Sequence, residues 1–149
     1  MRRSPVPRCF ARAFALGSLG VLMACSSAPS VTPSDGGFPA QPLDTLDSES
    51  GRLHLELRSS PQPVVRGTND AELTVTDART GAPQEGLTIT VAPWMPSMNH
   101  GSSNATVTAL GGGKYHLADV YLYMPGLWEL ETTFTGPVSD HAQPTVQVP

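Results

Sequence analysis

Alternating apolar and polar residues run through the chain from Arg52 to its end, and glycine- and proline-containing turns interrupt them at short intervals. A period of two predicts strands with one buried face. Seven segments have this pattern: LHLEL (53–57), AELTVTD (71–77), GLTITVAP (86–93), NATVTAL (104–110), YHLADVYLYM (115–124), LWELETTF (127–134) and PTVQV (144–148). With no helical periodicity, they predict an all-β fold, an immunoglobulin-like antiparallel β-sandwich of about seven strands.

Two prolines interrupt this pattern directly after the strand LTITVA. Pro93 and Pro96 have no N–H to donate to a ladder, so we expect regular pairing to end at about Ala92. The residues that follow should loop at the edge or end of the sheet. Met95 and Met98 are therefore not expected to be ordinary strand-core residues.

The first 24 residues have the features of a bacterial lipoprotein signal peptide. Four arginines precede an apolar run from Ala13 to Ala24, which is shorter than the ~20 residues that a membrane-spanning helix needs. The run ends in LMAC, which resembles the lipobox that directs lipidation of its cysteine and cleavage just before it. We expect Cys25 to become the lipidated first residue, the alternative being an ordinary secreted protein with a chance cysteine.

Residues 25–51 are expected to form the lipidated cysteine and a flexible linker, and residues 52–149 the folded domain. The stretch from Ser26 to Ser50 is rich in serine, threonine, proline, glycine and aspartate, a composition that cannot bury enough apolar surface to order itself. Acyl chains on Cys25 would then attach the domain to a membrane. Ser26 and Ser27 directly follow Cys25, in place of the aspartate that retains many lipoproteins in the inner membrane, which favours the outer membrane, facing the periplasm.

Loss of the signal peptide changes the charge. Four of the nine basic residues leave with it and all thirteen acidic residues stay, so five basic residues remain against thirteen acidic ones, a net charge near −8. Nucleic-acid binding relies on clusters of lysine and arginine, so this class of partner is not expected.

No catalytic residues are predicted, and we expect the protein not to be an enzyme. Ser139, Asp140 and His141 are the residue types of a hydrolase triad, but adjacent residues point apart and no Gly-x-Ser-x-Gly turn precedes them. The chain has no HExxH motif, no paired-cysteine zinc spacing and no phosphate-binding glycine loop.

The segment PWMPSMNHG (93–101) carries the candidate chemistry. Two thioethers and an imidazole form a soft ligand set that favours copper(I) over hard ions. Met124, in YMPG, joins this set if the strand order brings it to the same end of the sandwich. The alternative is that Trp94 and the methionines seal one end of the core, with His100 at the surface. His54 and His141 are expected to be solvated, and His116 to lie at the opposite end.

Two stretches, TGAPQEGLTITVAPWMPSMNHG and GGGKYHLADVYLYMPGLWELE, resemble the YtkA-like and FixH-like envelope domains. Those families carry a Gly-x-Pro turn, an MPxMxH segment and a late F/YxMxGxWE segment. The matching positions here are Gly81, Pro83, Met95, Pro96, Met98, His100, Tyr115, Met124, Gly126 and Trp128. The resemblance spans roughly residues 53–134. It implies an immunoglobulin-like sandwich associated with copper handling, with Met95, Met98, His100 and Met124 as candidate copper ligands.

The sequence thus leaves two functional hypotheses. In the first, the domain binds copper(I) through its methionine and histidine loop and takes part in copper handling or delivery. Alternatively it is a non-catalytic envelope module, in which the loop around Trp94 and Met95 is an apolar contact surface for a protein partner.

Overall fold

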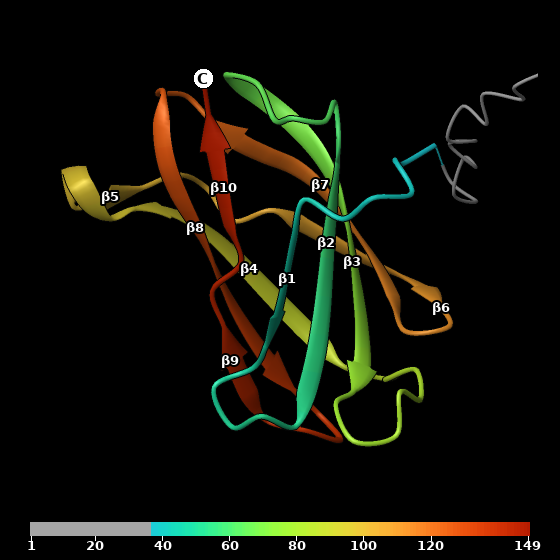
Figure 1. The fold of residues 1–149 in the computed structure, drawn as a ribbon. Helices are drawn as coiled ribbons and strands as arrows, with labels where there is room; N and C mark the ends of the chain where they lie inside the picture. The colour runs from blue at the N-terminus through green and yellow to red at the C-terminus, as the bar shows by residue number, and fades with distance from the viewer. Residues whose placement is uncertain (1–36) are drawn as a thin grey trace, which may run out of the picture.

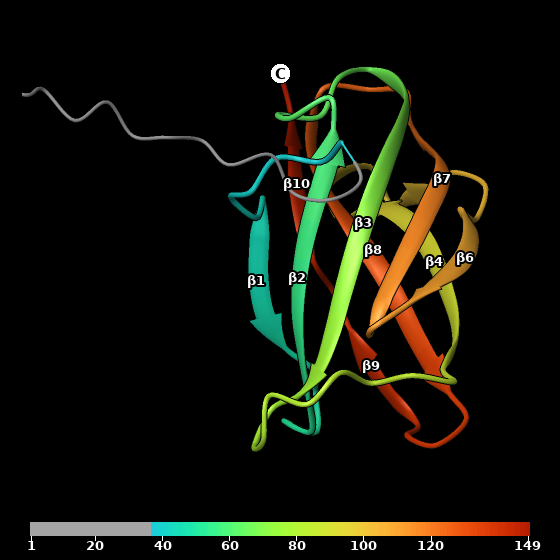
Figure 2. The same cartoon turned by 90° about the vertical axis from the view of Figure 1, so that its right-hand side faces the viewer.

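Two antiparallel β-sheets pack face to face in the computed structural model, which describes residues 37–149 (Figure 1). The first sheet has the order β1-β2-β3-β7-β6, and the second has the order β10-β8-β4-β5 with β9 also paired to β8. The elements are β1 (Asp44–Asp47), β2 (Leu53–Ser60), β3 (Gly67–Asp77), β4 (Thr88–Met95), the 3₁₀ turn η1 (Pro96–Met98), β5 (His100–Gly101), β6 (Thr106–Gly111), β7 (Lys114–Leu122), β8 (Gly126–Thr135), β9 (Asp140–Ala142) and β10 (Thr145–Val148). Figure 2 shows the first sheet in front of the second.

The core lies between the two sheets, where the sequence alternation predicts it. Leu53, Leu55 and Leu57 of β2 are fully buried, whereas the residues between them are half-buried on the outer face. Trp128 and Phe134 of β8 face them from the second sheet and are also fully buried. The predicted antiparallel β-sandwich is therefore confirmed, and all seven predicted strands are present.

The folded part of the chain begins earlier than we expected. The prediction of a flexible linker as far as residue 51 is therefore wrong for the second half of that segment. β1 pairs with β2 along its whole length, and Phe38 is buried. Two side chains fix the preceding segment: Arg58 Nε donates to the Ala40 carbonyl (3.3 Å) and Gln62 Nε2 to the Gln41 carbonyl (2.8 Å). These residues order themselves against an existing sheet, which their own composition does not reveal.

Pairing of β4 continues past Ala92, so the predicted end of the strand is also wrong. Pro93 is buried and lies opposite Leu130 of β8, and the strand runs on to Met95. The Pro93 carbonyl accepts a hydrogen bond from Ser102 N (3.0 Å). Because the N and O of a strand residue face the same neighbour, the missing N–H of Pro93 faces this edge segment, and the ladder to β8 is intact.

Three short strands were not predicted: β1, β5 and β9. β1 and β10 lie at the same side of the sandwich, where the Asp44 carboxylate accepts a hydrogen bond from Thr145 N (2.7 Å) and so connects the two sheets.

The predicted signal peptide (1–24), Cys25 and the first part of the linker lie outside the described residues. Among residues 37–149, no helix has the length and apolar character needed to cross a membrane.

Candidate functional site

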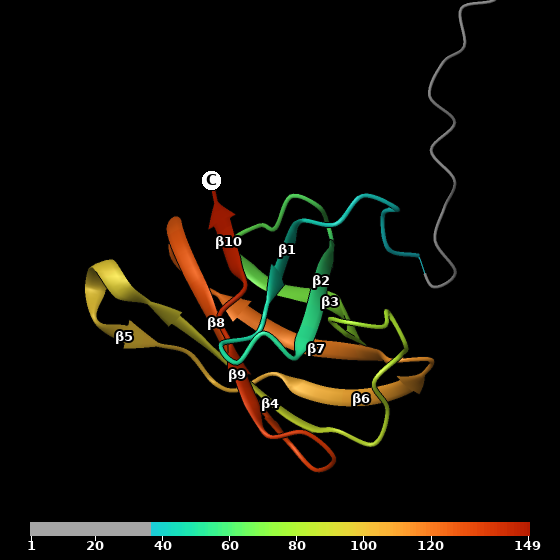
Figure 3. The same ribbon diagram turned by 60° about the horizontal axis from the view of Figure 1, so that its bottom comes forward.

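The segment PWMPSMNHG forms a hairpin that projects from one edge of the second sheet (Figure 3). Met95, the last residue of β4, lies directly opposite His100, the first residue of β5. η1 connects them, and Asn99 closes it in the left-handed conformation (φ 53°), its N–H donating to the Pro96 carbonyl (3.2 Å). Asparagine is one of the few residues that adopt this conformation readily. The turn chemistry thus brings the imidazole back beside the first thioether.

The three candidate methionines have different environments. Met95 is only 1% exposed and belongs to the core, contrary to the expectation that it would lie outside. Met98, on η1, is 53% exposed. Met124 is partly buried and packs against the core from the turn between β7 and β8. The alternative of a core lid therefore describes Met95 and the partly buried Met124 correctly, but not the exposed Met98.

Met95 and His100 each approach the segment 123–126, which carries Met124. The His100 and Tyr123 rings are stacked, with centroids 5.5 Å apart. On the other side of Met124, a Cβ placed on Gly126 would lie 3.3 Å from the Met95 Cε. Residues 95–100 and 123–126 thus lie side by side and are here called the methionine rim, and the strand order that the sequence left open places the segment carrying Met124 there.

Trp128 supports the rim from below. It is fully buried, its indole N–H donates to the Met124 carbonyl (3.0 Å), and its ring meets Tyr123 edge-on with centroids 5.4 Å apart. Trp128 therefore fixes both the backbone that carries Met124 and the ring that covers His100.

His100 contains an unsatisfied polar atom. Its Nε2 is buried and has no hydrogen-bond partner. Leaving a buried polar group unpaired costs ~1–3 kcal/mol, so such groups are rare and call for an explanation such as an absent ion or water.

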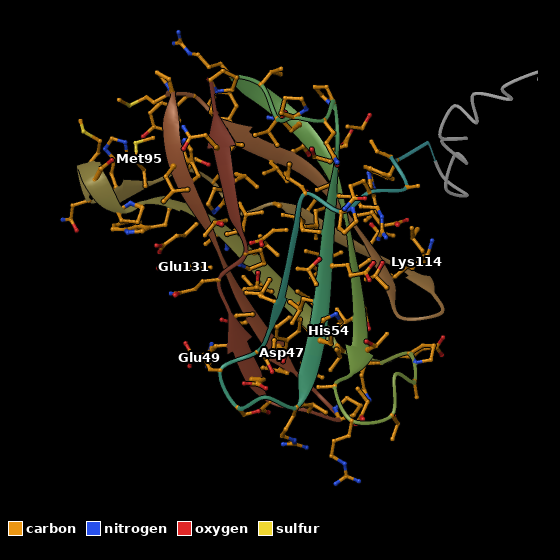
Figure 4. The ribbon with its side chains drawn as sticks, in the orientation of Figure 1. Asp47, Glu49, His54, Met95, Lys114 and Glu131 are labelled. Atoms are coloured by element: carbon orange, nitrogen blue, oxygen red, sulfur yellow. The ribbon has the colours of Figure 1, made fainter. Side chains whose placement is uncertain are left out.

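Harder ligands lie elsewhere. Figure 4 shows Met95 near the projecting hairpin and Asp47, Glu49 and His54 near the opposite end of the sandwich. Within the described part of the chain, no group of three or more histidine, cysteine, aspartate or glutamate side chains could hold a metal ion. The candidate donors carried by the methionine rim are thioethers and one imidazole, residue types that suit copper(I).

The remaining histidines are not part of the rim. His54, on the outer face of β2, pairs with Asp47 (2.7 Å), and His116 lies near Asp70 (3.6 Å) towards the start of β7. His141, expected in a loop, is on β9 and exposed, with its Nδ1 3.3 Å from the Thr133 hydroxyl.

Asp140, from the Ser-Asp-His segment, is a structural residue that the sequence analysis missed. Its carboxylate is buried and accepts hydrogen bonds from the hydroxyls of Ser48 (2.6 Å) and Ser50 (2.5 Å) and from the His141 N–H (2.9 Å). It therefore fastens the turn between β1 and β2 to the second sheet. The only sequence signal was a single acidic residue between short apolar strands.

Replacing Gly101 by alanine should disturb the hairpin that carries His100. The new Cβ would lie 2.7 Å from the Pro93 carbonyl oxygen and 3.1 Å from the Trp94 ring. The Pro93 carbonyl belongs to the backbone that bonds the edge segment, so displacing it should disturb the pairing of β5. We expect a loss of about 1–3 kcal/mol in the free energy of unfolding, measured by urea titration. Ser103→Ala, at an exposed position two residues on, is the control and should have almost no effect. Equal stability of the two variants would contradict the close approach.

A family model described as YtkA-like matches residues 47–133. This range includes β1 to β8 in part or in whole, together with the whole methionine rim. Neither the curated proteins nor the solved structures contain a significant match to the chain.

Proposed function

Since the chain belongs to the YtkA-like family, we propose that it is an envelope lipoprotein whose domain binds copper(I) at the methionine rim and serves in copper handling or delivery. The observation that carries this proposal is the buried, unpartnered Nε2 of His100. That nitrogen lies in a hairpin directly opposite Met95, and its ring stacks on the residue before Met124.

The donor set supports copper(I) over other ions. Neutral thioethers and imidazole bind a soft monovalent ion, whereas calcium and magnesium need several oxygen ligands. Met95, His100 and Met124 would hold the ion, and the exposed Met98 would lie at the entrance. An exposed thioether beside a half-buried site would allow an ion to be exchanged with a partner without unfolding the hairpin.

Copper(I) affinity of the full chain is the direct test. Cys9 and Cys25 should first be alkylated, because free thiolates bind copper(I) more strongly than thioethers do. We expect the protein to compete with a colourimetric copper(I) chelator, and His100→Ala to lower its affinity by at least about tenfold, ~1.4 kcal/mol. Met95→Leu and Met124→Leu keep the apolar volume and remove only sulfur, so each should also weaken binding.

His141→Ala is the matched control, because it removes an exposed imidazole from β9 and should leave the affinity unchanged. If the wild-type chain takes no copper(I) from the chelator, the proposed function is wrong. Equal losses in His100→Ala and His141→Ala would indicate nonspecific binding.

The exposed apolar side chains favour a second candidate, a protein-contact surface. Met98, Tyr121 and Leu127 are each 44–53% exposed, and all lie at or beside the methionine rim. A surface of this kind suits a partner protein. The copper assay separates the two functions, since a pure contact module would leave the chelator unaffected.

The place in the cell is part of the same proposal. The lipobox-like LMAC supports a lipid anchor at Cys25, and the serines that follow it favour the outer membrane, facing the periplasm. The lipid on Cys25 would attach the protein to the membrane. The excess of acidic over basic residues makes nucleic acid an unsuitable partner.

A further inference from the structure

We infer that Tyr123 is the positioning residue of the methionine rim: it holds the His100 imidazole by stacking, so that Nε2 stays directed into the rim before any ion arrives. This inference rests on the proposed function and assigns a role to a residue outside the candidate ligand set.

A metal-binding histidine is usually oriented by a hydrogen bond from its other ring nitrogen to a carboxylate or carbonyl. Among residues 37–149, no such group is hydrogen-bonded to the His100 ring. The contact that the ring does make is a stacked one with Tyr123, at 5.5 Å between centroids and 22° between planes. Stacking therefore has to supply the orientation that a hydrogen bond supplies elsewhere.

Tyr123 is itself held on several sides. The Trp128 ring meets it edge-on (5.4 Å) and the Tyr121 ring stacks on it (5.8 Å). Its backbone carbonyl accepts hydrogen bonds from the Arg66 guanidinium (3.3 and 3.4 Å). A ring fixed in this way gives the imidazole a rigid surface, which lowers the conformational entropy lost when a ligand binds.

Tyr123 also links the two segments that carry the ligands. It precedes Met124, whose carbonyl is hydrogen-bonded to the Trp128 indole, and its ring stacks on His100, which belongs to the β4–β5 hairpin. Losing this ring should therefore loosen the imidazole without removing any atom that could bind the ion.

The test compares copper(I) affinities of the full, thiol-alkylated chain. Stacked aromatic pairs contribute enough that Tyr123→Leu should bind about three- to tenfold more weakly, whereas Tyr123→Phe keeps the ring and should restore wild-type affinity. Tyr121→Leu makes the same change two residues away, on a ring that stacks on Tyr123. It leaves the Tyr123 ring in place and should weaken binding clearly less than Tyr123→Leu does, whereas His141→Ala, far from the rim, should leave the affinity unchanged.

A second measurement needs neither metal nor a stable variant. In metal-free wild-type protein, the carbon-bound ring protons of His100 should show upfield ring-current shifts in the NMR spectrum and nuclear Overhauser effects to Tyr123. Absence of these signals overturns the inference even if Tyr123→Leu fails to fold. If wild type binds copper(I) and folded Tyr123→Leu binds it equally well, the role of Tyr123 is wrong but the proposed function stands. If wild type does not bind copper(I), both the role of Tyr123 and the proposed function are wrong.

Discussion

Trp128→Ala is expected to lower the free energy of unfolding by about 3–5 kcal/mol, a large fraction of the total stability of a small domain. The indole is fully buried, so its removal leaves a large cavity between the sheets. It also removes the hydrogen bond to the Met124 carbonyl and the edge-on contact with Tyr123. Urea titration followed by circular dichroism measures the loss.

Two further variants divide this effect into its parts. Trp128→Phe keeps a buried ring but leaves the Met124 carbonyl without its donor, and we expect a loss of about 1–2 kcal/mol. Leu127→Ala, next along β8 and 48% exposed, should cost less than about 1 kcal/mol. A similar loss at positions 127 and 128 would show that Trp128 does not support the rim as described.

Asp140→Ala is expected to cost about 2–4 kcal/mol at neutral pH, because it leaves the Ser48 and Ser50 hydroxyls without their acceptor at the junction of the two sheets. Figure 1 shows the turn between β1 and β2 lying beside β9, where this carboxylate is located. Glu49→Gln removes a neighbouring, exposed carboxylate from the same turn and is the control. It should change stability little.

The same carboxylate should make the protein sensitive to acid. Burial by itself raises the pKa of Asp140, but hydrogen bonds from Ser48, Ser50 and the His141 amide outweigh burial and lower the pKa to about 2 from its usual 3.8. A pKa lower in the folded than in the unfolded state stabilises the protein above the unfolded value, and this stabilisation disappears as the pH falls. We expect a loss of about 2 kcal/mol between pH 4 and pH 2.

Asp140→Asn tests the pH dependence alone, because the amide does not titrate. Its stability relative to wild type should be lowest above pH 4 and should approach the wild-type value near pH 2. Parallel stability curves for the two proteins across this range would show that Asp140 is not responsible.

The sequence specified the faces of the long strands because side chains alternate strictly across a sheet. In β2, the leucines at every second position cannot turn outward without exposing all three, so the alternation also fixes the register. The same argument failed for β1, β5 and β9, which are too short for a period to be seen. Their backbone hydrogen bonds depend on the neighbouring long strands, which no pattern within the short segments reveals.

Within the methionine rim, the residue types indicated a soft ligand set of Met95, Met98 and His100, and the family resemblance added Met124 as a further candidate. Tertiary structure decided which of these residues are buried. Pro93 lacks an N–H only on the side that faces the edge segment and not on the side of β8, so β4 continues past it and places Met95 in the core. Strand order brought Tyr123, the residue before Met124, against His100, and no local pattern encodes that order. The sequence shows directly which residue types lie next to one another. Whether segments more than twenty residues apart, such as those of His100 and Tyr123, come together depends on how the two sheets bury their apolar faces against each other.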